Sequence, residues 1–503
     1  MGLIVFAVVL MLAIPQAAFL PLLDRDEPRF AEASREMIQS GDLIVPTFNH
    51  APRYAKPPLV YWCHAISFKI FGETPLAARL PSLLATAGTA LLLFIWGSQF
   101  GYKSIGLIAA FSYAFCLQTV QQGRVATADA LLIFFMTLTG LAGWNLLFAI
   151  KSAAKPKDFR IWKWRLILGL AAGFLAKGPE AWLPLLSLFI IAPSGWRTFL
   201  KLFLWSLAIV AIWAMPAYIQ THGDYWRMGL SEGIGQRMVT GMQGHGASSF
   251  TGYLVSLPLY LLIFWLSALP WSLLLLIERK KLFAGVKIDE ADRYLLTNVA
   301  IIFIVFSLMA TKLPHYTLPA FPFIALFFAR RWMMSGLSPW LPIKLTVGFG
   351  VVFAVIAFVF IPTAMLNHGS PSPVGELVLK AANQDALSPE TEFAMVDFQE
   401  PNVVWEMRRI VKGYGQSIPE ADVISFLGQP GPRAVVLSSA LWKRIEATSP
   451  AAKPDWKIYE TPGLNAAKVW DSSKHALALV DLTLVVKKGA APSVDGDVLD
   501  QKR

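Results

Sequence analysis

A dense group of charged residues follows the first apolar stretch of the chain. It reads Asp24-Arg25-Asp26-Glu27-Pro28-Arg29-Phe30-Ala31-Glu32. A carboxylate in such a place can accept a proton from a hydroxyl nucleophile. It can also begin a helix, because Asp caps the amides of a first turn and proline is favoured there; Asp24 suits this role at least as well as Asp26. Asp26 is therefore a candidate catalytic residue, and Glu27 is a second carboxylate to consider.

From Pro28 to Gly41 the pattern is that of an amphipathic helix. Arg29, Glu32 and Glu36 share one face at helical spacing. A helix of this kind lies along a membrane surface rather than crossing the membrane. We therefore expect this segment at the interface.

Basic, proline and aromatic residues are gathered in Arg53-Tyr54-Ala55-Lys56-Pro57-Pro58-Leu59-Val60-Tyr61-Trp62. Two prolines stiffen the backbone after Lys56 and would hold its side chain in a defined direction. The alternative is a lysine that reaches from the membrane to water beside interfacial aromatic rings.

Three shorter motifs place ionisable residues at expected helix ends: Gln122-Gly123-Arg124-Val125-Ala126-Thr127-Ala128-Asp129, Ala176-Lys177-Gly178-Pro179-Glu180 and Thr311-Lys312-Leu313-Pro314-His315-Tyr316. Each alone could be a helix end or a side chain that reaches for water. Ionisable residues at membrane level are costly and usually functional. By the topology derived below, six such residues face one side of the membrane: Asp26, Lys56, Arg124, Asp129, Lys177 and Lys312. We therefore predict one outward-facing cavity that holds two carboxylates and several cations.

These residue types indicate a class of chemistry. Cations at membrane level suit a phosphate whose lipid tail remains in the bilayer, because charge-assisted contacts strengthen away from bulk water. Carboxylates suit the proton of a hydroxyl nucleophile or of a leaving phosphate. The predicted reaction is group transfer from a lipid phosphate. The glycine-rich stretch Gly229–Gly246, which contains His245, is either a loop that orders over the substrate or a plain flexible connection.

The composition decides which kind of fold must position these residues. The chain has 503 residues, of which 55% are hydrophobic and only 15% charged, whereas soluble domains carry about 25% charged residues. This excludes a soluble enzyme, a disordered protein and a fibrous protein, and it predicts a polytopic α-helical membrane protein. A helix needs about 20 apolar residues to span a bilayer. We expect eleven spans, over residues 3–23, 77–98, 104–120, 127–150, 163–176, 179–193, 199–219, 253–277, 294–311, 315–334 and 341–362.

The net charge of +11 comes from Lys and Arg residues in short loops, a distribution that orients membrane helices and does not call for nucleic acid. It places the amino terminus in the cytoplasm. Residues 1–362 then form a transmembrane domain with outward loops at 24–76 and 220–252, and residues 363–503 form an outward α/β domain. In this tail we expect strands at Phe393–Phe398, Ala434–Ser439 and Ala476–Val486, a helix at Pro401–Val411, and disorder in the last dozen residues.

In this order, the segments resemble the bacterial lipid-carrier-dependent glycosyltransferases related to 4-amino-4-deoxy-L-arabinose lipid A transferase, and more distantly the protein O-mannosyltransferases. The most specific match is Asp26 through Glu32, followed by Gly41-Asp42 and Lys56-Pro57-Pro58; the three later motifs also fit. The resemblance covers residues 1 to about 335. It implies a GT-C fold with about eleven transmembrane helices and transfer of a sugar from a polyprenyl phosphate on the periplasmic side.

The resemblance also implies roles for single residues. Asp26 stands at the catalytic carboxylate position and Asp129 at the second acidic position, so both are candidate catalytic residues. With the cations found above, the substrate-binding candidates are Arg29, Lys56, Arg124, Lys177, Lys312, His315 and Tyr316; Glu27, Tyr54 and His245 are further candidates. The family usually has Asp or Glu directly before Lys-Pro-Pro, but this chain has Ala55 there, so a divalent metal is left open.

The sequence thus predicts inverting transfer of a sugar from a polyprenyl phosphate to lipid A or lipopolysaccharide core, in the inner membrane of a bacterium. A protein acceptor is the alternative within the same superfamily. A flippase or transporter could use the same cavity without chemistry. Transporters often consist of repeated halves, however, and this sequence shows no repeat and no nucleotide-binding motif.

Overall fold

The computed structural model describes residues 1–22, 26–151, 159–230, 250–284, 287–360, 362, 373–396, 400–448, 456–460, 467–471 and 476–488. The chain divides into two compact units. The first comprises Met1–Leu20 and Ala33–Thr363, and the second comprises Pro21–Glu32 and Ala364–Arg503. The division differs from the predicted domains in one respect, because the segment around Asp26 groups with the tail.

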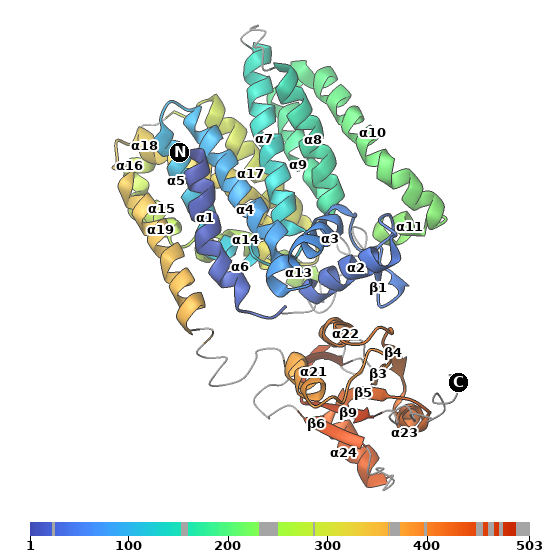
Figure 1. The fold of residues 1–503 in the computed structure, drawn as a ribbon. Helices are drawn as coiled ribbons and strands as arrows, with labels where there is room; N and C mark the ends of the chain where they lie inside the picture. Colours follow the sequence, from blue (N-terminus) through green and yellow to red (C-terminus); the bar gives the residue numbers. More distant parts are fainter. Residues whose placement is uncertain are drawn as a thin grey trace, which may run out of the picture. The chain divides into compact units, whose positions relative to one another are not determined.

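The first unit is almost entirely helical (Figure 1). Its first half contains α1 (Gly2–Ala18), α2 (Asp26–Ser40, shared with the second unit), the hairpin β1 (Thr47–Phe48) and β2 (Ala51–Pro52), α3 (Leu59–Phe71), α4 (Pro75–Ser98), α5 (Lys103–Ala114), α6 (Leu117–Gln122), α7 (Asp129–Lys151), α8 (Phe159–Lys177), η1 (Pro179–Trp182), α9 (Leu183–Ile191) and η2 (Pro193–Gly195). Its second half contains α10 (Trp196–Gln220), α11 (Asp224–Leu230), α13 (Phe250–Ser256), α14 (Leu259–Ser267), α15 (Trp271–Ile277), α16 (Arg279–Phe283), α17 (Glu290–Leu308), η4 (Pro314–Ala320), α18 (Phe321–Met334), α19 (Trp340–Val355) and the π-helical turn η5 (Ile356–Phe360).

Among the described residues, five helical stretches are long and apolar enough to cross a membrane: Pro75–Ser98, Asp129–Ala149, Pro193–Gln220, Glu290–Leu308 and Trp340–Phe360. A sixth span would be Thr251–Ser267 with Trp271–Ile277, a pair that bends by 102°. Each predicted apolar stretch overlaps a helix, but several are broken. The stretch 104–120, for example, divides into α5 and α6. The number of eleven spans therefore stays a prediction.

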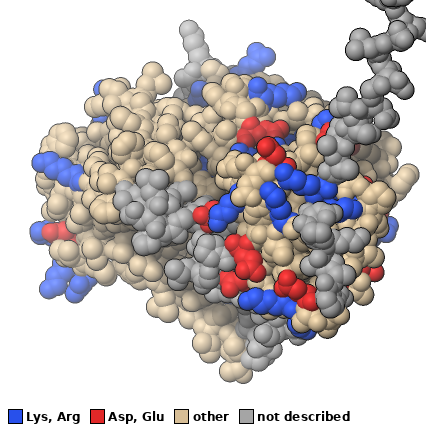
Figure 2. Space-filling view, turned by 60° about the horizontal axis from the view of Figure 1, so that its bottom comes forward, with Lys and Arg blue, Asp and Glu red and all other residues tan. Residues whose placement is uncertain are grey.

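The membrane helices pack closely and leave apolar side chains on their outer faces. A Cβ atom placed on Gly97 of α4 would lie 2.6 Å from Gly106 of α5, so only glycine permits this approach of the two backbones. Along α10, Leu204, Trp205 and Ile212 are exposed, as expected of a helix that faces lipid. Figure 2 likewise shows wide areas of surface without a charged residue.

A group of four ions, three of them buried, joins the beginning of α17 to the end of α18. Asp292 is fully buried and contacts Arg330 at 3.1 Å and Arg331 at 2.6 Å. Asp289 caps α17 by accepting a hydrogen bond from the Asp292 amide at 2.9 Å. Two carboxylates and two guanidinium groups thus balance within the fold, which is how buried charges are normally tolerated.

The amphipathic helix α2 forms as predicted, and its place at the membrane surface stays a prediction. Its polar face is not open to water, because Glu32, Arg35 and Glu36 are all buried. In the first unit, Glu36 accepts hydrogen bonds from the Thr47 hydroxyl at 2.6 Å and from the Asn49 amide at 2.6 Å. The charged face therefore fixes the β1–β2 hairpin.

The tail contains a mixed five-stranded sheet in the order β4-β3-β5-β9-β6. The strands are β3 (Glu392–Val396), β4 (Gln416–Ile418), β5 (Arg433–Ser438), β6 (Trp456–Glu460) and β9 (Leu482–Lys487); β7 (Ala467–Asp471) and β8 (Ala476–Val480) form a separate hairpin. β3 runs parallel to β4 and β5, and β9 runs antiparallel to β5 and β6. The helical elements are α21 (Pro373–Asn383), α22 (Pro401–Arg408), η6 (Glu420–Asp422), α23 (Val423–Gly428) and α24 (Ser439–Thr448). Side chains of α23 and α24 pack in one core cluster with β3, β5 and β9.

Two details of the predicted tail are wrong. The single strand expected at Ala476–Val486 is two strands, β8 and β9, which separate at Asp481 and belong to different sheets. Ser439 does not end a strand but begins α24. Alternating apolar residues cannot mark such a break, because both strands carry the same pattern. The last dozen residues, with their predicted disorder, lie outside the described residues.

Candidate active site

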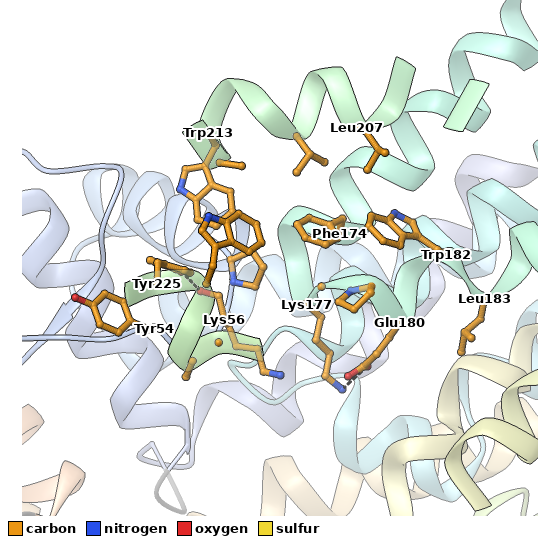
Figure 3. Close-up of a pocket in the computed structure, with 18 of the residues that line it drawn as sticks. Tyr54, Lys56, Phe174, Lys177, Glu180, Trp182, Leu183, Leu207, Trp213 and Tyr225 are labelled. Carbon is orange, nitrogen blue, oxygen red and sulfur yellow. Dashed lines mark hydrogen bonds and ion pairs between the residues drawn. The ribbon is translucent and has the colours of Figure 1, made fainter. Parts of the chain in front are cut away.

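A cavity of about 690 Å³ lies in the first unit, lined by the loop before α3 and by residues of α8, η1, α9, α10, α11 and α17. Most of its wall is apolar. Much of that part is aromatic, with side chains of Phe174, Trp182, Trp213, Trp226 and Phe306, and Met309 adds to it. Figure 3 shows Lys56, Lys177 and Glu180 pointing toward the same end of the cavity. The cavity therefore combines a long apolar wall with a compact charged end.

The aromatic wall is a continuous series of ring contacts. Trp182 stacks on Phe174 at 4.8 Å between centroids, and Phe174 lies 6.5 Å from Trp226. Trp226 in turn lies 6.1 Å from Trp213, which meets Tyr225 edge-on at 5.2 Å. Such a wall offers a large apolar contact area and few polar groups that need a hydrogen-bond partner, which suits a hydrocarbon chain.

Lys177 is the central ion at the charged end. Its Nζ atom lies 2.8 Å from Asp129 Oδ1 and 3.2 Å from Glu180 Oε2. The hydroxyl of Thr127 donates a hydrogen bond to Asp129 Oδ2 at 3.0 Å. Asp129 is therefore held by two groups, while Glu180 is the carboxylate that lines the cavity.

Local sequence explains how these side chains meet. α7 begins at Asp129 and α8 ends at Lys177, so each charge complements the dipole of its own helix. Gly178 then adopts a φ of 111°, which a residue with a Cβ rarely adopts, and Pro179 begins η1. This tight turn places Glu180 back beside Lys177.

The predicted residues Tyr316 and His315 lie beside this ion cluster. The Lys177 ammonium is 5.4 Å from the centroid of the Tyr316 ring, a cation–π distance. Tyr316 is buried in η4, and its ring meets that of His315 at 5.2 Å, edge to face. The structure thus brings Asp129, Lys177, His315 and Tyr316 together, from segments that are far apart in the chain.

Lys56 reaches the cavity from the first loop, where α11 fixes its backbone. The Tyr225 hydroxyl donates a hydrogen bond to the Lys56 carbonyl at 2.5 Å, and the Tyr54 ring packs 5.2 Å from the Tyr225 ring. Burial raises the pKa of Tyr225 well above its usual value, so this hydroxyl keeps the proton that it donates. The loop is held further by the Trp213 indole, which donates to the Ile44 carbonyl at 3.0 Å.

Two of the predicted cations have structural partners instead. The Lys312 ammonium donates hydrogen bonds to the carbonyls of Phe306 at 3.3 Å, Met309 at 2.6 Å and Ser307. It therefore caps the carboxyl end of α17. Arg124 donates to the carbonyl of Gln16 at 2.5 Å, near the end of α1. Free carbonyls at helix ends attract cations strongly, and neither residue is among those that line the cavity.

Asp26 and Arg29 belong to the second unit, as does the buried Glu27. Asp26 is the first residue of α2, its side chain is 62% exposed, and it pairs with Arg29 at 3.6 Å. This position agrees with the predicted helix start. His245 and the rest of the glycine-rich loop from 231 to 249 lie outside the described residues.

Sequence analysis missed Glu180 and the aromatic wall as parts of the site. Glu180 lies three residues after the candidate Lys177. Nothing in the sequence Lys-Gly-Pro-Glu, however, indicates that the turn brings the Glu180 carboxylate back to the lysine. Tryptophan is common in membrane proteins, so the sequence does not single out Trp182, Trp213 and Trp226. Only their convergence on the cavity distinguishes them from other tryptophans. Among the described residues, no group of three His, Cys, Asp or Glu could hold a metal ion, and the divalent metal stays a prediction.

Comparison with known proteins finds relatives in sequence and in fold. Residues 55–219 match the family described as dolichyl-phosphate-mannose-protein mannosyltransferase. The chain is 30% identical over 62% of its length to the undecaprenyl phosphate-alpha-4-amino-4-deoxy-L-arabinose arabinosyl transferase 2 of Sodalis glossinidius, and 29% identical over 68% to the corresponding transferase of Edwardsiella ictaluri. These matches span only 56% and 62% of the two relatives' own length.

The structural comparison covers nearly the whole chain. The crystal structure of ArnT from Cupriavidus metallidurans bound to undecaprenyl phosphate superposes with a TM-score of 0.72 and 17% identity, over 96% of this chain and 97% of that one. The chain has a GT-C fold. The resemblance predicted from the motifs is confirmed.

Proposed function

We propose that this GT-C protein transfers a sugar from a polyprenyl phosphate carrier to lipid A or to lipopolysaccharide core. The observation that carries the proposal is the cavity itself, in which an aromatic wall leads to two lysines at one end. Such a cavity matches a ligand that is a hydrocarbon over most of its length and an anion at its head. The relatives and the bound lipid of the solved structure support the same class of donor.

In this proposal, Lys56 and Lys177 bind the phosphate that links the lipid to the sugar. The bond between the anomeric carbon and the phosphate oxygen breaks during transfer, and negative charge gathers on the leaving polyprenyl phosphate. Cations held in a site that excludes water stabilise such charge far better than they would in bulk solvent. Their role is thus to bind the donor and to stabilise the leaving group.

The acceptor oxygen attacks the anomeric carbon from the opposite face, which inverts its configuration. If the acceptor is a hydroxyl, its proton must be removed, and by the resemblance Asp26 is the carboxylate that takes it. If the acceptor is an anionic phosphate, no base is needed and Asp26 orients the attack. Asp129 keeps Lys177 in place rather than touching the reacting atoms.

The proposed setting is the inner membrane of a bacterium, with the cavity open to the periplasm. The partners are then the lipid-linked sugar, the lipid A or lipopolysaccharide acceptor, and the surrounding membrane lipids. The positions of Lys and Arg in the loops support this orientation.

The test is a transfer assay with purified protein in proteoliposomes that contain a polyprenyl phosphate sugar and lipid A. We expect lipid A to gain the mass of one sugar for each polyprenyl phosphate released, and Lys177→Met to abolish the gain. Donor movement across the bilayer without sugar transfer would contradict the proposal and indicate a flippase.

A protein acceptor is the second candidate, favoured by the match to the protein mannosyltransferase family. The same proteoliposomes, supplied with Ser- and Thr-containing peptides in place of lipid A, test it directly. Glycosylated peptide with unchanged lipid A would favour this candidate.

A further inference from the structure

The first two turns of α2 belong with the tail. Residues Pro21–Glu32 form one compact unit with Ala364–Arg503, whereas the remainder of α2, from Ala33 onward, belongs to the first unit. Asp26, the carboxylate that the proposed function assigns to the acceptor, is the first residue of α2. It therefore lies on a short helical stretch that contacts the tail.

A buried ion pair connects this stretch to the tail. The Nε atom of Arg408 donates a hydrogen bond to Oε1 of Glu32 at 3.2 Å, and the side chains of Arg408 and Glu32 are only 2% and 0% exposed. Both residues belong to the second unit, although 376 positions separate them in the sequence. Attraction between charges is strong where water is excluded, and loss of one partner would leave the other charge buried.

The tail holds the guanidinium group of Arg408 in a defined direction. Arg408 is the last residue of α22, where the helix dipole favours a cation. Its Nη1 atom donates hydrogen bonds to the carbonyls of Lys412 and, at 3.3 Å, of Gly413. Its guanidinium carbon lies 4.3 Å from the centroid of the Tyr414 ring, a cation–π distance. A guanidinium group fixed by its own surroundings can in turn fix the carboxylate that it contacts.

Helix geometry links Glu32 to Asp26. The two residues are six positions apart on one helix, which corresponds to about 9 Å along the axis and to side-chain directions that differ by about 120°. The Glu32 side chain can therefore be fully buried while that of Asp26 is 62% exposed. Because the helical backbone is stiff over so short a distance, holding Glu32 also sets the direction of Asp26.

We propose that Arg408 is a positioning residue, which holds the beginning of α2 through Glu32 and so orients Asp26 toward the acceptor. The inference rests on the proposed function, in which Asp26 removes the proton of the acceptor or orients the attack. It gives the tail a part in transfer that is separate from donor binding, because the residues that line the cavity belong to the first unit. Arg408 itself touches neither the donor nor the reacting atoms.

Three variants separate positioning from stability: Arg408→Met, Arg408→Lys and the double variant Glu32→Met/Arg408→Met. Each is purified as the full chain and compared with the wild type in proteoliposomes that contain the polyprenyl phosphate sugar and lipid A. The measured quantities are kcat, the dissociation constant for polyprenyl phosphate, and the temperature of thermal unfolding.

Arg433→Met is the matched control. Arg433 also forms an ion pair, with Glu392 at 2.8 Å, and its guanidinium carbon also lies near a ring, 4.8 Å from the centroid of Phe426. Both of these partners lie in the tail, so this variant removes the same kind of contacts without releasing α2.

We expect Arg408→Met to lower kcat by up to about 100-fold, the effect that a misplacement of about 1 Å can have, and to leave the affinity for polyprenyl phosphate unchanged. It should also unfold at a lower temperature, because Glu32 loses a buried partner. The double variant should recover this stability, since replacing both charges of a buried pair by apolar side chains is often neutral, but it should not recover kcat. Arg408→Lys keeps the charge and should retain more turnover than Arg408→Met, and Arg433→Met should keep the wild-type kcat.

A second comparison tests whether Arg408 acts through Asp26. Arg408→Met is combined with Asp26→Asn, and kcat of the double variant is compared with that of Asp26→Asn alone. We expect no further loss, because the carboxylate that Arg408 orients is already absent. Effects of residues that act as a unit are not additive.

Three results would overturn the inference and leave the proposed function standing. One is recovery of kcat together with stability in Glu32→Met/Arg408→Met, which would mean that Arg408 contributes stability alone. The others are equal losses of kcat in Arg408→Met and Arg433→Met, and an equal effect of Arg408→Met with and without the Asp26 carboxylate. A wild type that transfers no sugar would overturn the proposed function as well.

Discussion

The Nζ atom of Lys177 lies 2.8 Å from Oδ1 of Asp129, so this ion pair joins the last residue of α8 to the first residue of α7. The lysine stands at the negative end of one helix dipole and the aspartate at the positive end of the other, which favours both charges. The pair also fixes the two helix ends against each other at the cavity. Positioning of the proposed phosphate-binding lysine and stability of the fold are therefore coupled here.

Loss of the Asp129 charge should destabilise the protein and misplace Lys177. Breaking a buried ion pair lowers the free energy of unfolding by about 3–5 kcal/mol. For Asp129→Asn we expect a loss of about 3 kcal/mol or less, because Glu180 still contacts the lysine. Thermal unfolding in detergent measures the change. The double variant Asp129→Asn/Lys177→Met should recover part of the loss, whereas strictly additive effects would show that the two residues do not interact. Asp224→Asn is the control, since its pair with Arg227 is exposed.

Removal of the Tyr225 hydroxyl should loosen the loop that carries Lys56. Tyr225→Phe loses the hydrogen bond to the Lys56 carbonyl but keeps the ring contacts with Tyr54 and Trp213. One hydrogen bond contributes about 0.5–1.5 kcal/mol, so we expect KM for the lipid donor to rise while kcat changes less. Steady-state kinetics in proteoliposomes measures both constants. Tyr218→Phe, at an exposed position of α10, should change neither; equal changes in the two variants would exclude a specific role for Tyr225.

Substitution of Lys312 should weaken folding rather than donor binding. The lysine was predicted to meet a phosphate, but its ammonium is bonded to three carbonyls at the end of α17. Lys312→Met should therefore lower the free energy of unfolding by about 1–3 kcal/mol and leave donor affinity within about twofold, well inside the 1.4 kcal/mol of a tenfold change. A stable Lys312→Met variant that no longer binds the donor would show that Lys312 belongs to the binding site after all.

Asp26→Asn should yield a folded protein that transfers little or no sugar. Asn keeps the shape of Asp and much of its capping ability, so the variant separates chemistry from folding. With a hydroxyl acceptor, loss of a general base slows transfer by roughly 10² to 10⁴, measured as initial rate with purified protein. Asp24→Asn should cause a milder loss. Near-normal turnover by Asp26→Asn would leave Asp26 with only its role at the start of α2.

The proposed orientation makes a simple prediction for reporter fusions. A reporter joined after Arg503 should behave as periplasmic, and one inserted between Lys151 and Lys163 as cytoplasmic, because Lys and Arg concentrate in the second segment. Fusions in intact cells, assayed for alkaline phosphatase activity and for fluorescent protein, test both positions. A cytoplasmic signal from the tail would reverse the assignment of the cavity to the periplasm.

The sequence alone determined the class of the protein and most of the charged end of its site. The chain has more apolar residues than a soluble domain can bury, so many of them must face lipid. The helical membrane character therefore follows from composition. Lys56, Asp129 and Lys177 were found because ionisable residues at membrane level are costly and therefore rarely without purpose. The order of their motifs also carried the resemblance that the comparisons confirm.

Only the tertiary structure decided which cations belong to the cavity. Arg124 and Lys312 look like Lys56 and Lys177 in the sequence, but helix-end carbonyls compete for a cation, and which group it meets depends on how the helices pack. The buried charged face of α2 is a second case, since amphipathic spacing shows a polar face but not what covers it. Glu180 is the third. The turn at Gly178 brings it beside Lys177, but its place on the cavity wall depends on how helices that are distant in the chain pack around that turn.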